Sequence, residues 1–179
     1  MKQDNPVKES LSLSKNHYEN FPVVSFLVPK HLRKDVAIIY WFARTADDFA
    51  DEGNLLPEER LRKLNEFEHR LTSLLKGNCE GDIEFALNKT IKERNLTPKY
   101  FYDLLKAFKQ DVVKKSYENF EELLDYCNYS ANPVGRLILE LNDIRNDEAF
   151  GYSDKICTAL QLTNFYQDIK VDYLKGRIY

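Results

Sequence analysis

The sequence predicts an all-α protein, and three observations support this class. Apolar residues recur at steps of three and four along nearly the whole chain, which is the spacing of amphipathic helices. The 179 residues include six Gly and six Pro, which argues against long flexible linkers. No repeat, low-complexity tract or domain boundary is visible. We therefore expect one domain over residues 1–179, with residues 1–14 as a flexible N-terminus.

The first two predicted helices are bounded by clear start and stop residues. Residues 32–52 follow Pro29 and carry apolar side chains at helical spacing until Gly53-Asn54 ends the pattern. Pro57 opens the next helix, and a stripe of leucines with one phenylalanine runs along it to a stop at Gly77-Asn78.

A shorter helix is expected over 82–94. Thr97 then serves as a cap and Pro98 as the first helical residue of a helix that runs to about Gln110.

The segment 119–142 is also helical in pattern but contains Asn132-Pro133-Val134-Gly135. The proline removes a backbone hydrogen bond and should kink the helix there. Ser153-Asp154 is expected to cap a last helix that ends near Tyr173.

Composition limits the classes of function. The chain is 43% apolar and 31% charged, and its net charge of −3 argues against nucleic acid as a partner. Cys79, Cys127 and Cys157 are odd in number and form no CxxC motif, which favours a reduced, cytoplasmic protein. Residues 1–15 lack the apolar core of a signal peptide, and no stretch of the chain is apolar enough for a transmembrane segment.

Two pairs of aspartates stand out against this background. Asp47 and Asp51 are four residues apart, and so are Asp168 and Asp172. Each pair therefore lies on one face of its helix, where like charges repel. Either pair alone could be a solvated acidic helix end. Two pairs inside apolar helical patterns suggest a cation held between them, and sparse oxygen ligands suit Mg²⁺ completed by substrate phosphates.

Other polar side chains share these helices. Arg44 lies one turn before Asp47 and could hold phosphate oxygens. Gln161 and Asn164 continue the face of Asp168 and Asp172, so the sequence predicts a polar stripe; the alternative is an ordinary exposed face.

Three further sets of residues contain a tyrosine or histidine that could take part in a site. Tyr126 and Tyr129, one turn apart, are either core residues or aromatic faces that meet a carbocation or diphosphate. Glu66 and His69 have the Glu-x-x-His spacing of di-iron proteins, but the motif occurs once, so we interpret them as a solvated face. His17 carries no information by itself.

Three ordered motifs resemble the squalene/phytoene synthase family. Residues 40–52, YWFARTADDFADE, resemble its first Asp-rich motif, and residues 126–135, YCNYSANPVG, resemble its tyrosine-containing helix. Residues 161–172, with Gly176-Arg177-Ile178-Tyr179, resemble its second Asp-rich motif. Within the family, Asn20-Phe21-Pro22-Val23 and FARTADD resemble the bacterial hopanoid-cluster branch HpnC.

The resemblance implies an isoprenoid-synthase helical bundle around a central cavity, with Mg²⁺ as cofactor. It implies Asp47, Asp51, Asp168 and Asp172 as metal ligands. It implies a prenyl diphosphate as the substrate, held by the side chains His17, Arg44, Asp48, Gln161 and Asn164. It also implies that Tyr40, Arg44, Tyr126 and Tyr129 act in catalysis.

The implied reaction is conversion of presqualene diphosphate to hydroxysqualene in isoprenoid and hopanoid biosynthesis. Head-to-head condensation of two prenyl diphosphates such as farnesyl diphosphate, giving squalene or phytoene, is the alternative within enzymes. A non-catalytic prenyl-diphosphate-binding or scaffold fragment is the alternative of another class. A plain helical interaction module would leave the paired aspartates unexplained. The lipophilic product leaves open a peripheral contact with the inner membrane.

Family members continue well beyond the second motif, so we expect this chain to be incomplete at its C-terminus. An incomplete bundle should expose an apolar face, and the candidates are the stripe of Leu137, Ile138 and Leu141 and the Leu160/Phe165 side of the last helix.

Overall fold

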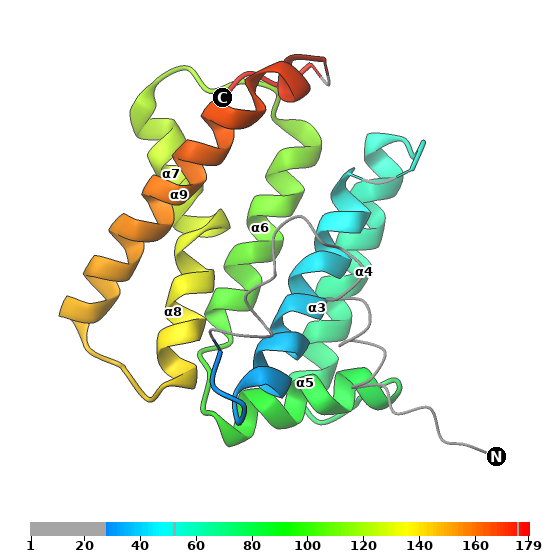
Figure 1. Cartoon of the computed structure of the whole chain (residues 1–179). Helices are drawn as coiled ribbons and strands as arrows, with labels where there is room; N and C mark the ends of the chain where they lie inside the picture. Colours follow the sequence, from blue (N-terminus) through cyan, green and yellow to red (C-terminus); the bar gives the residue numbers. More distant parts are fainter. Residues whose placement is uncertain (1–27, 52, 175) are drawn as a thin grey trace.

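In the computed structural model, which describes residues 28–51, 53–174 and 176–179, every regular element is a helix (Figure 1). The all-α prediction is therefore confirmed. The helices in chain order are α3 (Arg33–Asp51), α4 (Pro57–Leu75), α5 (Asp82–Glu93), α6 (Lys99–Val113), α7 (Phe120–Ser130), α8 (Asn132–Leu141) and α9 (Asp147–Leu174).

The hydrophobic core lies where α3, α4 and α6 meet. Phe42 of α3 stacks on Phe67 of α4 with ring centres 5.0 Å apart, and it meets the edge of Phe101 of α6 at 5.1 Å. Leucines from α4, α5 and α6 fill the space around these rings. Aromatic contacts of this geometry stabilise a core beyond simple area burial, so α3 is firmly anchored in the core.

Charged side chains inside the bundle are paired. Asp35 of α3 accepts hydrogen bonds from Arg94 at 2.8 Å and from Thr90 at 3.3 Å. Glu84 of α5, almost fully buried, pairs with Arg70 of α4. Because an unpaired buried charge is costly, these contacts fix α5 across the ends of α3 and α4.

The start of α6 differs from the prediction. Thr97 does not cap the helix: its hydroxyl donates to Glu140 Oε1 at 2.6 Å and its backbone N–H donates to Glu140 Oε2 at 2.8 Å. Glu140 is a buried carboxylate of α8. Leaving this buried charge without hydrogen-bond donors would cost more free energy than leaving the first N–H groups of α6 without a cap. Pro98 is consequently the N-cap of α6, and Lys99 is the first helical residue.

The break predicted near Pro133 is confirmed, because α7 ends at Ser130 and α8 begins at Asn132. The predicted start of the last helix at Ser153-Asp154 is wrong. Helix α9 begins at Asp147, since Asn146 caps it by accepting a hydrogen bond from the backbone N–H of Ala149 at 2.8 Å.

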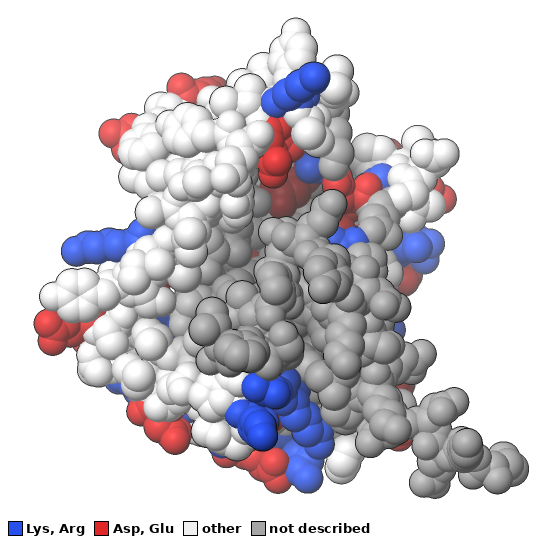
Figure 2. Space-filling model, in the orientation of Figure 1, with Lys and Arg blue, Asp and Glu red and all other residues white. Residues whose placement is uncertain are grey.

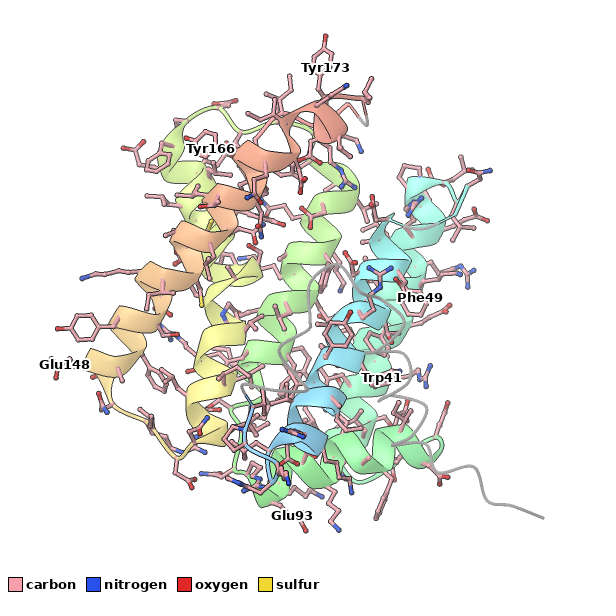
Figure 3. The ribbon with its side chains drawn as sticks, in the orientation of Figure 1. Trp41, Phe49, Glu93, Glu148, Tyr166 and Tyr173 are labelled. Carbon is pink, nitrogen blue, oxygen red and sulfur yellow. The ribbon has the colours of Figure 1, made fainter. Side chains whose placement is uncertain are left out.

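Helix α9 packs on α7 and α8 but has no fully buried residue. Its outer side carries large apolar side chains that are more than half exposed: Ile156, Leu160, Tyr166, Ile169, Val171, Tyr173 and Leu174. Tyr173 projects from the end of the helix away from the bundle (Figure 3). The exposed apolar face expected on the last helix is thus present for Leu160, which is 60% exposed.

The other part of that expectation is wrong. Leu137 and Leu141 of α8 are buried, because α6 and α9 both pack against that helix. Glu66 and His69 of α4 are exposed, as interpreted from the sequence. Among the described residues, we find no helix with the length and apolarity needed to cross a bilayer.

Candidate active site

A cleft of about 500 Å³ separates the two acidic helices. Asp47 and Asp51 of α3 line one wall, and Asp168 and Asp172 of α9 line the other. Helix α6 lies between them and supplies Phe108 and Asp111 to the floor (Figure 1). The prediction that the two aspartate pairs face each other across a cavity is therefore confirmed. In Figure 2, acidic side chains gather in a hollow in the upper part of the molecule.

The polar stripe of α9 also faces this cleft. Gln161 and Asn164 line it together with Asp168 and Asp172, as the three- and four-residue steps predict. Gln167 joins them. Oxygen-bearing side chains thus follow the inner side of α9, whereas its outer side mixes exposed apolar side chains such as Ile156 with lysines such as Lys170. The helix lacks the fully buried apolar stripe that usually holds a helix against the core of a soluble protein.

Arg44 lies between two carboxylates of its own helix. Its guanidinium nitrogens are 2.9 Å from Asp47 Oδ2 and 2.8 Å from Asp48 Oδ1, at the i,i+3 and i,i+4 spacings. A cation at this position offsets the repulsion within the acidic motif. Tyr40 lies one turn earlier on α3 and is half-buried. Of the other predicted residues, His17 lies outside the described residues.

The two tyrosines of α7 line different hollows. Tyr126 is buried and lines the cleft. Tyr129 instead lines a second hollow with Asn132 and Arg136, and Lys106 Nζ lies 3.4 Å from the centre of its ring. Of the two tyrosines that the resemblance implies for catalysis, Tyr126 is therefore the one that lines this cleft.

An arginine from the end of the chain also reaches the cleft. Arg177 Nη2 lies 2.8 Å from Asp51 Oδ1, although the two residues are 126 positions apart. The backbone N–H of Arg177 donates to the carbonyl of Asp172, and Ile178 exchanges backbone hydrogen bonds with the loop at Lys115 and Tyr117. The resemblance includes Gly176-Arg177-Ile178-Tyr179 in its second motif but implies no role for these side chains.

Aromatic rings form one side of the cleft. Phe165 of α9 stacks on Tyr179 with ring centres 4.1 Å apart, and the Tyr126 ring lies 6.0 Å from Phe165. All three residues line the cleft. Such faces attract a cation, so an apolar, electron-rich surface adjoins the carboxylates.

Asp111 is a site residue that no motif of the sequence marks. It is the acceptor of a 2.9 Å hydrogen bond from the Tyr126 hydroxyl. Burial raises the pKa of Asp111 from its ordinary value of 3.8 to about 7, and Asp47 and Asp51 add to the rise; the Tyr126 hydrogen bond and Arg177 oppose it. Burial likewise raises the pKa of Tyr126 well above its usual range.

The donor set fits Mg²⁺ held jointly with a phosphate better than a closed metal site. Among the described residues, no three acidic, histidine or cysteine side chains lie close enough together to hold an ion by themselves. The four aspartates are instead divided between two walls of one cleft. Mg²⁺ is commonly bound by one or two carboxylates plus water and substrate phosphates, which is the arrangement that divided walls allow.

A helical bundle with facing Asp-x-x-x-Asp helices defines the class of protein: an isoprenoid-synthase fold. The family model of squalene/phytoene synthase matches residues 14–179, and the chain belongs to that family.

The similar proteins include two bacterial enzymes of known name. The chain is 39% identical over 164 residues to a hydroxysqualene synthase of Sinorhizobium fredii (strain NBRC 101917 / NGR234), covering 90% of this chain and 54% of that protein. It is 40% identical over 166 residues to a hydroxysqualene synthase of Zymomonas mobilis subsp. mobilis (strain ATCC 31821 / ZM4 / CP4), with the same two coverages.

A solved structure agrees. The crystal structure of squalene synthase HpnC from Alicyclobacillus acidocaldarius is similar with a TM-score of 0.89 and 40% identity, covering 97% of this chain and 65% of that one. The chain spans about half the length of the curated relatives named above.

Proposed function

We propose that this chain forms the diphosphate-ionising part of an enzyme that converts presqualene diphosphate to hydroxysqualene. The observation that carries the proposal is the pair of Asp-x-x-x-Asp faces on opposite walls of one cleft. The 39–40% identity to proteins named hydroxysqualene synthase supports this substrate over others of the family.

Asp47, Asp51, Asp168 and Asp172 would hold Mg²⁺, with Asn164 beside them. When bound, the metal supplies neutralisation of the departing diphosphate. Arg44 and Arg177 already pair with the acidic motif of α3, and they can turn toward diphosphate oxygens when these arrive. Gln161 continues the polar wall of α9, Asp48 holds Arg44 on α3, and Tyr40 lies on the same helix as Arg44.

Loss of diphosphate leaves a carbocation, which the aromatic side of the cleft shelters. Tyr126, Phe165 and Tyr179 present ring faces there, and each face stabilises a cation by about 0.5–2 kcal/mol. Tyr129 is left out of this proposed site, because it lines a different hollow.

The test is product identification with the full-length protein that contains this chain. Presqualene diphosphate with Mg²⁺ should give hydroxysqualene, and a chelator should abolish diphosphate release. Farnesyl diphosphate given alone should yield no hydrocarbon. Squalene or phytoene formed from farnesyl diphosphate would instead establish head-to-head condensation. Tight binding of presqualene diphosphate with no release of diphosphate would establish a non-catalytic binding protein.

A further inference from the structure

Tyr126 and Asp111 form a hydrogen-bonded pair inside the cleft. Tyr126 of α7 donates its phenolic proton to Asp111 Oδ2 of α6 at 2.9 Å, and both residues line the cleft wall. A phenol oxygen that donates its only proton still has lone pairs to accept a hydrogen bond. The Tyr126 oxygen can therefore accept a hydrogen bond from a water molecule bound in the cleft.

The neighbours of this pair assign it a role different from that of the other carboxylates. Asp51 is already paired with Arg177 at 2.8 Å, and Asp47 with Arg44 at 2.9 Å. The charged and titratable groups that face Asp111 are Tyr126 from α7, Asp47 and Asp51 from α3, Tyr117 from the loop before α7, and Arg177 and Tyr179 from the end of the chain. Among these, Tyr126 is the group for which the structure records a hydrogen bond with Asp111.

We propose that Asp111 is the final acceptor, through Tyr126, of the proton lost by the water molecule that captures the carbocation. This inference rests on the proposed function. A lone pair of the water oxygen forms the new C–O bond while one water proton moves to Tyr126 Oη. The phenolic proton of Tyr126 moves at the same time to Asp111 Oδ2. The cation and the carboxylate are both neutralised, which leaves an alcohol and an uncharged carboxylic acid.

The environment of Asp111 suits this task. In the metal-free protein, burial raises the pKa of Asp111 to about 7, which makes it a stronger proton acceptor than an ordinary aspartate, and a general base works best when its pKa lies near the working pH. The alternative is that the hydrogen bond only joins α6 to α7. That structural role would affect all steps of turnover alike, whereas the relay acts only after diphosphate has left.

The experiment measures two quantities for each variant of the full-length protein with presqualene diphosphate and Mg²⁺: the rate of diphosphate release and the share of product that is alcohol. Asp111→Asn keeps the size and the hydrogen-bond acceptor but cannot take up a proton. Tyr126→Phe keeps the ring and removes the hydroxyl. Asp111→Glu restores a proton acceptor. Tyr102→Phe is the matched control, because Tyr102 of α6 bonds Thr72 at 2.9 Å outside the cleft.

In Asp111→Asn and Tyr126→Phe the alcohol share should fall at least about a hundredfold, the lower end of general-base effects, whereas diphosphate release should fall by a much smaller factor. Asp111→Glu should recover part of the alcohol, and Tyr102→Phe should match wild type. An unchanged alcohol share in both Asp111→Asn and Tyr126→Phe would overturn the relay. An equal fall in release and alcohol formation would also overturn it, in favour of the structural role.

A wild type that releases diphosphate and makes alcohol, beside variants that do so equally well, refutes the relay alone. A wild type that releases no diphosphate refutes the proposed function and the relay together. Should Asp111→Asn fail to fold, as judged by its melting transition, Tyr126→Phe gives the same two readouts without a change of charge.

Discussion

Arg177 and Asp51 join the end of the chain to the first acidic helix through a 2.8 Å ion pair in which the arginine side chain is only 14% exposed. The contact places a cation among Asp51, Asp111 and Tyr179. Where carboxylates crowd a cleft, a cation of this kind reduces their mutual repulsion. In the absence of metal, Arg177 therefore contributes to the positive charge that the paired aspartates require.

Replacement of this arginine should make the protein depend more on metal. Arg177→Gln is expected to lower the stability of the chelated protein by about 1–2 kcal/mol, a figure reduced because Asp51 is partly exposed. Added Mg²⁺ should then raise the melting temperature of Arg177→Gln more than that of wild type. A Mg²⁺-induced shift equal to or smaller than that of wild type would contradict this role.

Removal of one carboxylate from either wall should abolish most turnover and leave the fold intact. Asp47→Asn or Asp168→Asn loses a proposed metal ligand and relieves like-charge repulsion on its helix. Diphosphate release should be measured with the melting temperature as a check on folding. Asp125→Asn, an exposed residue of α7, is the matched control and should behave as wild type. Near-normal release by Asp47→Asn in Mg²⁺ would rule out the metal role.

The titration of Asp111 should appear in the stability of the metal-free protein. Its pKa is raised from 3.8 to about 7 on folding, mainly by burial. Between these pH values the unfolded chain gives up a proton that the folded protein retains. The free energy of unfolding should therefore fall as the pH rises from about 4 to about 7, and level off above that.

Asp111→Asn removes this proton and should flatten that part of the curve. In thermal melts in a chelating buffer, the melting temperature of the variant relative to that of wild type should rise by at least about 3 °C between pH 4 and pH 8. This figure uses about 2–4 °C per kcal/mol for a protein of this size. Parallel curves for the two proteins would show that Asp111 titrates normally.

The crossing of α8 and α9 should tolerate no added methyl group. A Cβ at Gly135 would lie 2.3 Å from Ser153 Oγ and 2.5 Å from Cys157 Sγ. Gly135→Ala should cost about 1–3 kcal/mol, as overpacking does. Gly151→Ala on α9 meets nothing within 4 Å and should be neutral or stabilising. Chemical denaturation measures both, and a Ser153→Ala/Cys157→Ala background should rescue Gly135→Ala if the clash is the cause.

The outer face of α9 should cause the isolated chain to associate. Its large apolar side chains are more than half exposed, and Leu174 reaches 77%. A group of large exposed apolar side chains of this kind is unusual on a soluble monomer. Light scattering after size-exclusion chromatography should show oligomers of the 179-residue chain. A monomer that melts cooperatively would show that this surface is stable in water.

The sequence predicted those parts of the fold and site that depend on local spacing. Helix existence, the break at Pro133 and the shared face of Asp168 and Asp172 all follow from residues close together in the chain. The start of α6 could not be predicted, because Thr97 bonds a carboxylate that lies 43 residues away. Asn146, the N-cap of α9, is a favoured capping residue type. The sequence alone does not distinguish it from the alternative start at Ser153-Asp154.

Asp111 and Arg177 were missed as site residues for a related reason. Each lies in an unremarkable polar context, and each gains its importance from partners distant in sequence: Tyr126 for Asp111 and Asp51 for Arg177. Tyr126 and Tyr129 could not be told apart either, since residues three apart share a helix side. Their surroundings are decided by where α6 and α9 pack.

The two walls of the cleft differ in local stability, because α9, which forms one of them, has no fully buried residue. The Asp47/Asp51 wall belongs to α3, whose Phe42 packs in the core against Phe67 and Phe101. The opposite wall can open locally while that core stays folded. A ligand that touches both walls would suppress this opening, because it binds the closed form alone. Substrate capture and completion of the native fold would then be the same event on this side of the molecule.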